Sequence, residues 1–202
     1  MTETRKQLEY DFKRKLIIDA AKSVFFGSGF ENSTMEDIAR EAGYSKGSLY
    51  SYFNSKNEIC FAIVNNYYSK LSDLIQKISE ESDTGLNKLI KVKDALIEEF
   101  AQNADCCEIL NSFRYYRHQC MEAAEEIQRN EMYNERINKL LIDIIRSGIE
   151  DHSIRNTVDS KKLAHALWNN ETSFITELKS ADTNAFDYLF ELVVDSIKAE
   201  VP

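Results

Sequence analysis

Apolar residues recur along most of the chain with the spacing of amphipathic α-helices. The first stripe puts one residue every three or four positions on a single helical face: Ile17, Ala20, Ala21, Val24 and Phe25. The stripe is followed by Phe-Gly-Ser-Gly-Phe at positions 26–30, where glycine is the expected residue for a left-handed helix end. The pattern therefore predicts a first helix that ends within this segment.

Two short helices separated by a glycine turn are predicted next. Either of two segments, Ser33–Glu36 or Thr34–Asp37, can form the capping box that starts the first short helix. Gly43 ends this helix about two turns later. Ser45 can cap the second short helix, which we expect to run to about Phe53.

The remaining residues continue the helical pattern as far as the C-terminus. Stripes of apolar residues predict helices over about 59–78, 86–100, 109–113, 137–145, 160–178 and 184–200. The chain has one Pro and six Gly among 202 residues, whereas average usage is about 5% Pro and about 7% Gly. Because so few turn residues disfavour a fold of many short strands, we predict an all-α protein of about nine helices.

Charge is distributed unevenly along the chain. The formal net charge is −9, but residues 1–56 hold 9 basic and 8 acidic residues, while residues 57–202 hold 16 basic and 26 acidic ones. A uniformly acidic protein would avoid nucleic acid, because phosphates attract Lys and Arg. Here the N-terminal segment can approach DNA while the acidic remainder stays away from it.

The sequence shows neither a signal peptide nor a membrane span, so we expect a cytoplasmic protein whose cysteines are reduced thiols. Residues 1–15 are polar and carry several basic side chains, unlike a signal peptide. No apolar run approaches the roughly 20 residues of a membrane span. The common metal and nucleotide motifs are missing from the sequence, so we expect no cofactor, no metal site and no membrane partner.

Residues 34–53 have the pattern of a helix-turn-helix, with a short helix, a glycine turn and a second helix that starts with small polar residues. Gly43 supplies the turn, and Gly47 lacks a side chain, which would let the second helix approach a DNA groove closely. The basic residues at positions 5–15 form either an arm that contacts DNA or a frayed tail.

Several of these segments resemble the N-terminal domain of the TetR family of bacterial transcriptional regulators. The resemblance covers about 45 residues and includes the specific pattern Leu-Tyr-x-Tyr-Phe-x-x-Lys at positions 49–56. The matching segments are 17–21, Phe25, 29–30, 33–39, 42–53 and 56–59.

The resemblance implies a homodimeric, all-α repressor that is released from double-stranded operator DNA by a small-molecule effector. Residues 1–56 would form the DNA-binding domain, a helix over 58–80 would link the two parts, and residues 57–202 would form the effector-binding and dimerisation domain. Carried over by position, the DNA-binding residues are Ser33, Thr34, Tyr44, Ser45, Lys46, Gly47, Ser48, Tyr50, Tyr52 and Lys56.

The last two predicted helices are apolar on two faces, which indicates burial on two sides. They are either central core helices or a pair that packs against the same pair of a second subunit. The residues expected at such a dimer interface are Leu163, Leu167, Phe174, Phe186, Leu189, Phe190, Val193 and Ile197.

Effector-binding candidates are aromatic, titratable or cationic residues of the C-terminal part. They could line a pocket between helices, and a buried Glu among them would need a partner or a ligand. The candidates are Phe113, Tyr116, Arg117, His118, Trp168 and Glu171.

Two alternatives to a ligand-responsive repressor remain. Cys106, Cys107 and Cys120 could make the protein a metal- or thiol-responsive regulator, although their spacing fits no standard metal site. A helical-bundle enzyme of the di-iron type needs Glu-x-x-His on facing helices, and none of the three histidines follows a Glu at that spacing. We therefore expect the protein not to be an enzyme.

Overall fold

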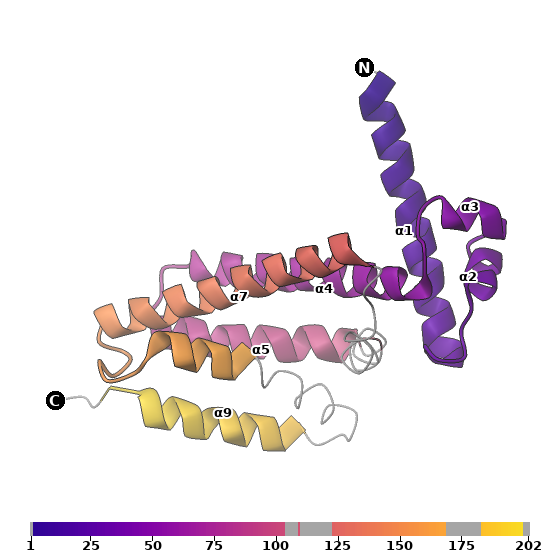
Figure 1. Cartoon of the computed structure of the whole chain (residues 1–202). Helices are drawn as coiled ribbons and strands as arrows, with labels where there is room; N and C mark the ends of the chain where they lie inside the picture. Colours follow the sequence, from indigo (N-terminus) through magenta and orange to yellow (C-terminus); the bar gives the residue numbers. More distant parts are fainter. Residues whose placement is uncertain (1, 104–108, 110–122, 169–182, 200–202) are drawn as a thin grey trace. The chain divides into compact units, whose positions relative to one another are not determined.

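The structure is a computed structural model that describes residues 2–103, 109, 123–168 and 183–199. Within these ranges the regular elements are helices (Figure 1), which confirms the predicted all-α fold class. None of the described helices is long and apolar enough to cross a membrane. Residues 160–168 are helical, and the other helices are α1 (Thr2–Ser28), α2 (Met35–Glu41), α3 (Lys46–Tyr50), α4 (Lys56–Ser79), α5 (Gly85–Gln102), α7 (Ala124–Glu150) and α9 (Thr183–Ile197).

The chain divides into two compact units. Unit 1 comprises residues 1–67 and 108–130, and unit 2 comprises residues 68–107 and 131–202. Helices α4 and α7 each begin in unit 1 and end in unit 2. The division of roles between residues 1–56 and 57–202 stays a prediction, because it concerns function and not compactness.

Helices α1, α2 and α3 supply much of the core of unit 1. Helix α2 begins with the second of the two possible capping boxes, in which Thr34 and Asp37 bond each other's backbone N–H groups. Gly29 and Gly43 adopt φ values of +77° and +71°, as the predicted left-handed helix end and turn require. The largest fully buried side chains of these helices and the adjoining turn are Ile17, Phe25, Ile38, Leu49 and Phe53.

Helix α1 extends far beyond the apolar stripe that predicted it. Residues 5–15, for which the sequence left an arm or a frayed tail open, lie in the first half of this helix, which projects past α2 and α3 in Figure 1. This half exposes Leu8 and Phe12 at 65% and 62% of their surfaces. Its helical form therefore does not depend on burial of a continuous apolar face within unit 1.

Unit 2 contains a close approach between the start of α5 and the end of α7. A Cβ atom on Gly85 would lie 2.1 Å from the backbone nitrogen of Gly148, so only glycine fits there. The loop that follows α7 caps the same end of α5, because Asp151 accepts the Gly85 N–H at 2.7 Å and Ser153 Oγ accepts the Leu86 N–H at 3.1 Å. These contacts fix where the two helices meet.

Side-chain contacts join the other helices of unit 2. The Lys93 ammonium of α5 lies 5.7 Å from the ring centroid of Phe190 in α9. Arg136 of α7 pairs with Asp73 of α4 at 3.0 Å. Helix α5 thus packs beside α9, and α7 beside α4, as Figure 1 shows.

Candidate DNA-binding site

The turn between α2 and α3 presents a polar, open surface. Ser45 caps α3, since its hydroxyl accepts the Ser48 N–H. Lys46, Gly47 and Ser48 are all exposed, and a Cβ atom added at Gly47 would meet nothing within 4 Å. This face of α3 is therefore free to approach a macromolecular partner closely.

The cation on this surface is paired within the protein. The Lys46 ammonium donates to the carboxylate of Glu36 on α2, and both side chains are about half exposed. Their hydrogen bond lowers the pKa of Glu36 and raises the pKa of Lys46. An exposed pair of this kind is weak, so a phosphate can displace the carboxylate.

Three tyrosines lie next to one another beside α3. The Tyr52 ring stacks on Tyr10 at a centroid distance of 5.1 Å, and Tyr44 lies 6.4 Å from Tyr52. Tyr50, on α3 itself, is 43% exposed. The sequence pattern missed Tyr10, because this residue lies on α1 outside the segments that resemble the family.

Ser33 and Lys56, two of the residues expected to contact DNA, are engaged inside unit 1. Ser33 is 2% exposed, and its hydroxyl donates to the Gly29 carbonyl oxygen at 2.6 Å. The Lys56 ammonium donates to the carbonyl oxygens of Phe30, Glu31 and Ser33 at 2.8, 2.9 and 3.0 Å. These contacts use all three ammonium N–H groups and hold the loop between α1 and α2 in place.

A buried ion pair that the sequence did not reveal supports the turn after α3. The Arg14 guanidinium donates to the Tyr52 carbonyl oxygen at 3.0 Å and to Glu126 at 2.8 Å. Its central carbon lies 4.0 Å from the ring centroid of Phe53. Glu126, in the first turn of α7, is only 3% exposed.

Asn65 of α4 completes this network. Its amide nitrogen donates to the carboxylate of Glu126 at 2.7 Å and to the backbone oxygen of the same residue at 2.8 Å. Its amide oxygen accepts from Asn130 at 3.0 Å. Helices α1, α4 and α7 are thus joined around one buried carboxylate within unit 1.

Trp168 is the one effector candidate that falls within the described residues. It is 5% exposed, its indole N–H donates to Asn134 at 2.7 Å, and its ring meets Tyr68 edge-to-face at 5.5 Å. The other five candidates lie outside the described residues: Phe113, Tyr116, Arg117, His118 and Glu171. The three cysteines Cys106, Cys107 and Cys120 lie outside them too. Among the described residues, no group of three or more His, Cys, Asp or Glu could hold a metal ion.

The residues expected at a dimer interface differ in their exposure. Phe190 and Ile197 are 6% exposed and pack inside unit 2, whereas Leu189 is 56% exposed. Tyr188 and Leu192, near Leu189, are also exposed. Leu163, Leu167 and Val193 are half-buried, Phe174 lies outside the described residues, and the side chain of Phe186 is not described.

Comparisons with known proteins bear on the N-terminal part most directly. A family model described as bacterial regulatory proteins, tetR family, matches residues 17–63. The HTH-type transcriptional regulator YuxN of Bacillus subtilis is 32% identical over 93 residues, which cover 46% of this chain but only 32% of YuxN. The HTH-type transcriptional repressor KstR2 of Rhodococcus jostii is 26% identical over 147 residues, which cover 73% of this chain and 70% of KstR2.

The likeness to solved structures extends over most of the chain. The transcriptional regulator FadR of Bacillus subtilis, solved in complex with stearoyl-CoA, superposes with a TM-score of 0.68 at 20% identity. The superposition covers 83% of this chain and 88% of FadR. At this identity the comparison establishes a shared fold.

Proposed function

The chain belongs to the tetR family of bacterial regulatory proteins through its residues 17–63, and from this premise we propose that it is a transcriptional regulator that binds operator DNA. The observation that carries the proposal is the open face of α3 in a helix-turn-helix. Ser45, Lys46, Gly47 and Ser48 are exposed there, and small or polar side chains at such a position reach base edges and phosphates. The relatives YuxN and KstR2 are transcriptional regulators by name.

The residues expected to contact DNA fall into those on an open surface and those engaged within unit 1. We assign Tyr44, Ser45, Lys46, Gly47, Ser48, Tyr50 and Tyr52 to DNA contact, because each lies on or beside the open face of α3. Thr34 is exposed at the start of α2 and can reach a phosphate while it caps the helix. Ser33 and Lys56 contribute indirectly, because they hold the loop before α2 through bonds to main-chain carbonyls.

The regulator acts as a homodimer that contacts two half-sites. Three neighbouring apolar side chains of α9, Tyr188, Leu189 and Leu192, are 61%, 56% and 47% exposed in one copy of the chain. A second copy would cover them in an isologous interface. Leu189→Glu is expected to yield monomers in sedimentation velocity, whereas Glu191→Gln, an exposed change on the same helix, is expected to leave the dimer intact.

A small molecule bound by unit 2 releases the protein from DNA, as expected of a repressor. The FadR structure of the same fold holds stearoyl-CoA, which supports a ligand-binding role for the helical bundle. Cytoplasmic location and the lack of enzymatic activity follow from the role of a DNA-binding regulator.

The test is fluorescence anisotropy of the full chain with its own upstream intergenic DNA and with scrambled DNA of equal length. We expect binding to the upstream fragment to be tighter by roughly a thousandfold, as for other specific regulators. We also expect Lys46→Ala and Tyr50→Ala to weaken it, and Lys77→Ala, an exposed cation of α4 in unit 2, to leave it unchanged. Equal, weak binding to both fragments, or equal effects of the three variants, would refute the proposal.

A further inference from the structure

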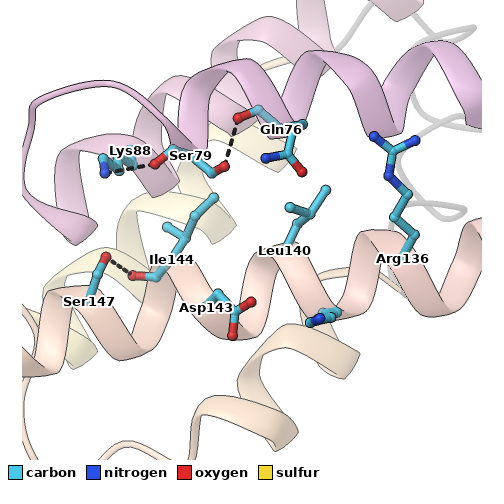
Figure 2. A pocket seen from close by; sticks show the side chains of 9 residues that line it. Gln76, Ser79, Lys88, Arg136, Leu140, Asp143, Ile144 and Ser147 are labelled. Atoms are coloured by element: carbon cyan, nitrogen blue, oxygen red, sulfur yellow. Dashed lines mark hydrogen bonds between the residues drawn. The ribbon is translucent and has the colours of Figure 1, made fainter.

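Unit 2 contains a groove between α4, the start of α5 and α7 (Figure 2). The cavity measures about 490 Å³, which lies in the usual range for sites that take small molecules. Its lining residues are Gln76, Ser79, Lys88, Arg136, Lys139, Leu140, Asp143, Ile144 and Ser147.

The groove is more basic than the part of the chain that contains it. Its lining carries three cations and one carboxylate, although residues 57–202 hold 16 basic and 26 acidic residues. Such a reversal of local charge attracts an anion.

The cations retain donors for a ligand. Lys88 donates to the Ser79 carbonyl oxygen at 2.9 Å, which occupies one of its three N–H groups. Arg136 pairs with Asp73 at the edge of the groove and has further guanidinium N–H groups. Lys139 is exposed and forms no ion pair with any residue that the structure describes.

The floor of the groove is apolar. Ile144 is 2% exposed and Leu140 is half-buried, and Figure 2 shows Leu140 directly opposite Gln76. The Arg136 side chain reaches from α7 toward α4 at one end. Asp143 lies farther along α7 than Arg136 and Lys139, and its carboxylate repels an anion. The anionic group of a ligand is therefore directed toward Arg136 and Lys139.

We propose that this groove binds a small amphipathic anion, with its carboxylate or phosphate on Arg136 and Lys139 and its apolar body on Leu140 and Ile144. The proposal deepens the effector-binding part of the proposed function and rests on it. Helices α4 and α7, which form the two walls, both begin in unit 1. A ligand between them therefore contacts the two helices that unit 1, which contains the helix-turn-helix, shares with unit 2.

The test is isothermal titration calorimetry of the full chain with octanoate, octyl phosphate and 1-octanol, each below its micellar or solubility limit. We expect at least one of the two anions to bind saturably at one site per chain, and more tightly than the alcohol. Lys139→Glu reverses a charge that no described residue pairs with, so the fold is retained, and we expect it to weaken anion binding by about tenfold or more. The anion that binds more tightly identifies a carboxylate or a phosphate as the natural head group.

Lys77→Glu is the matched control, because it reverses the charge of an exposed lysine of α4 that does not line the groove. Its anion affinity is expected to stay within about twofold of the native value. The proposal is overturned if neither anion binds, if octanol binds as tightly, or if the two lysine variants behave alike. Operator binding, measured on the same preparations without ligand, tests the proposed function separately: its loss beside intact anion binding would refute the regulatory role and leave the groove assignment standing.

Discussion

The buried carboxylate of Glu126 makes a sharp prediction about the stability of unit 1. Glu126→Gln keeps the shape of the side chain but replaces one acceptor oxygen with an amide NH₂ group. One carboxylate oxygen accepts from Arg14 at 2.8 Å and from the partly exposed Arg129 at 3.3 Å, and the other accepts from Asn65 at 2.7 Å. Whichever way the new amide turns, its NH₂ group faces a donor.

The neighbours cannot rearrange to accept this NH₂ group. Arg14 has no acceptor atom, and a flipped Asn65 amide would set its oxygen against the Glu126 backbone oxygen, to which its NH₂ group now donates at 2.8 Å. Removal of one charge of a buried pair costs roughly 3–5 kcal/mol. Because the Arg14 side chain is 18% exposed and can recover some hydration, we expect a loss of about 3 kcal/mol, the lower end of that range.

Urea unfolding followed by circular dichroism at one fixed protein concentration measures this loss. With a slope of about 2 kcal/mol per molar urea, the midpoint of the transition that includes unit 1 is expected to fall by about 1.5 M. Glu125→Gln is the control, because it removes the same charge from the same helical turn at an exposed position and is expected to cost less than about 0.5 kcal/mol. If the two variants unfold at the same urea concentration, the network does not stabilise the protein as argued.

Three further predictions concern a close contact, a surface pair and pH. Gly85→Ala places a Cβ 2.1 Å from the backbone of α7 and is expected to cost about 3 kcal/mol in urea unfolding; Gly47→Ala, which meets nothing, is expected to raise stability by about 0.5 kcal/mol, and equal effects would contradict the close contact. Glu36→Gln frees Lys46 from its partner, so binding to scrambled DNA is expected to tighten several-fold in anisotropy titrations, with the salt slope steeper by up to about one unit; unchanged binding would show that the pair does not compete with phosphate. Hydrogen bonds from a lysine, an asparagine and a backbone N–H lower the pKa of Asp83 from 3.8 to about 2, so its contribution to stability is present above pH 3.8 and is lost as the pH falls toward 2. The melting temperatures of Asp83→Asn and of the native chain are therefore expected to converge between pH 3.8 and pH 2. A constant difference between them would refute this role of Asp83.

Local sequence patterns were sufficient for the two helices of the helix-turn-helix, although α3 ends at Tyr50 and not at about Phe53, and they left the start of α2 ambiguous. Ser33 and Thr34 both fit a capping box, and the outcome depends on where Ser33 points. Its hydroxyl turns back to the carbonyl oxygens of Gly29 and Val24, which leaves Thr34 to cap α2 with Asp37. Which of these two adjacent hydroxyl residues caps α2 therefore depends on how the loop before the helix packs, and a local sequence pattern does not contain that information.

Contacts between residues far apart in the chain could not be predicted from the sequence. Arg14 and Glu126 are 112 residues apart, and neither lies on an apolar stripe or in a motif that would single it out. The beginning of α7 was missed for a related reason. This helix starts at Ala124, well before the apolar stripe over 137–145, because its first turns expose residues such as Met132 and so hide the periodicity.

Lys56 gives unit 1 a chemical reporter of its own folding. An amine reacts with an acylating reagent through its nitrogen lone pair, and the Lys56 nitrogen is surrounded by three carbonyl oxygens and the ring of Phe30, whose centroid lies 4.7 Å away. Acylation at this position therefore requires that the ammonium first leave the carbonyl oxygens of the loop between α1 and α2. Lys46, with a half-exposed side chain, needs no such step, so the ratio of the two labelling rates reports how firmly Lys56 holds this loop in the intact protein.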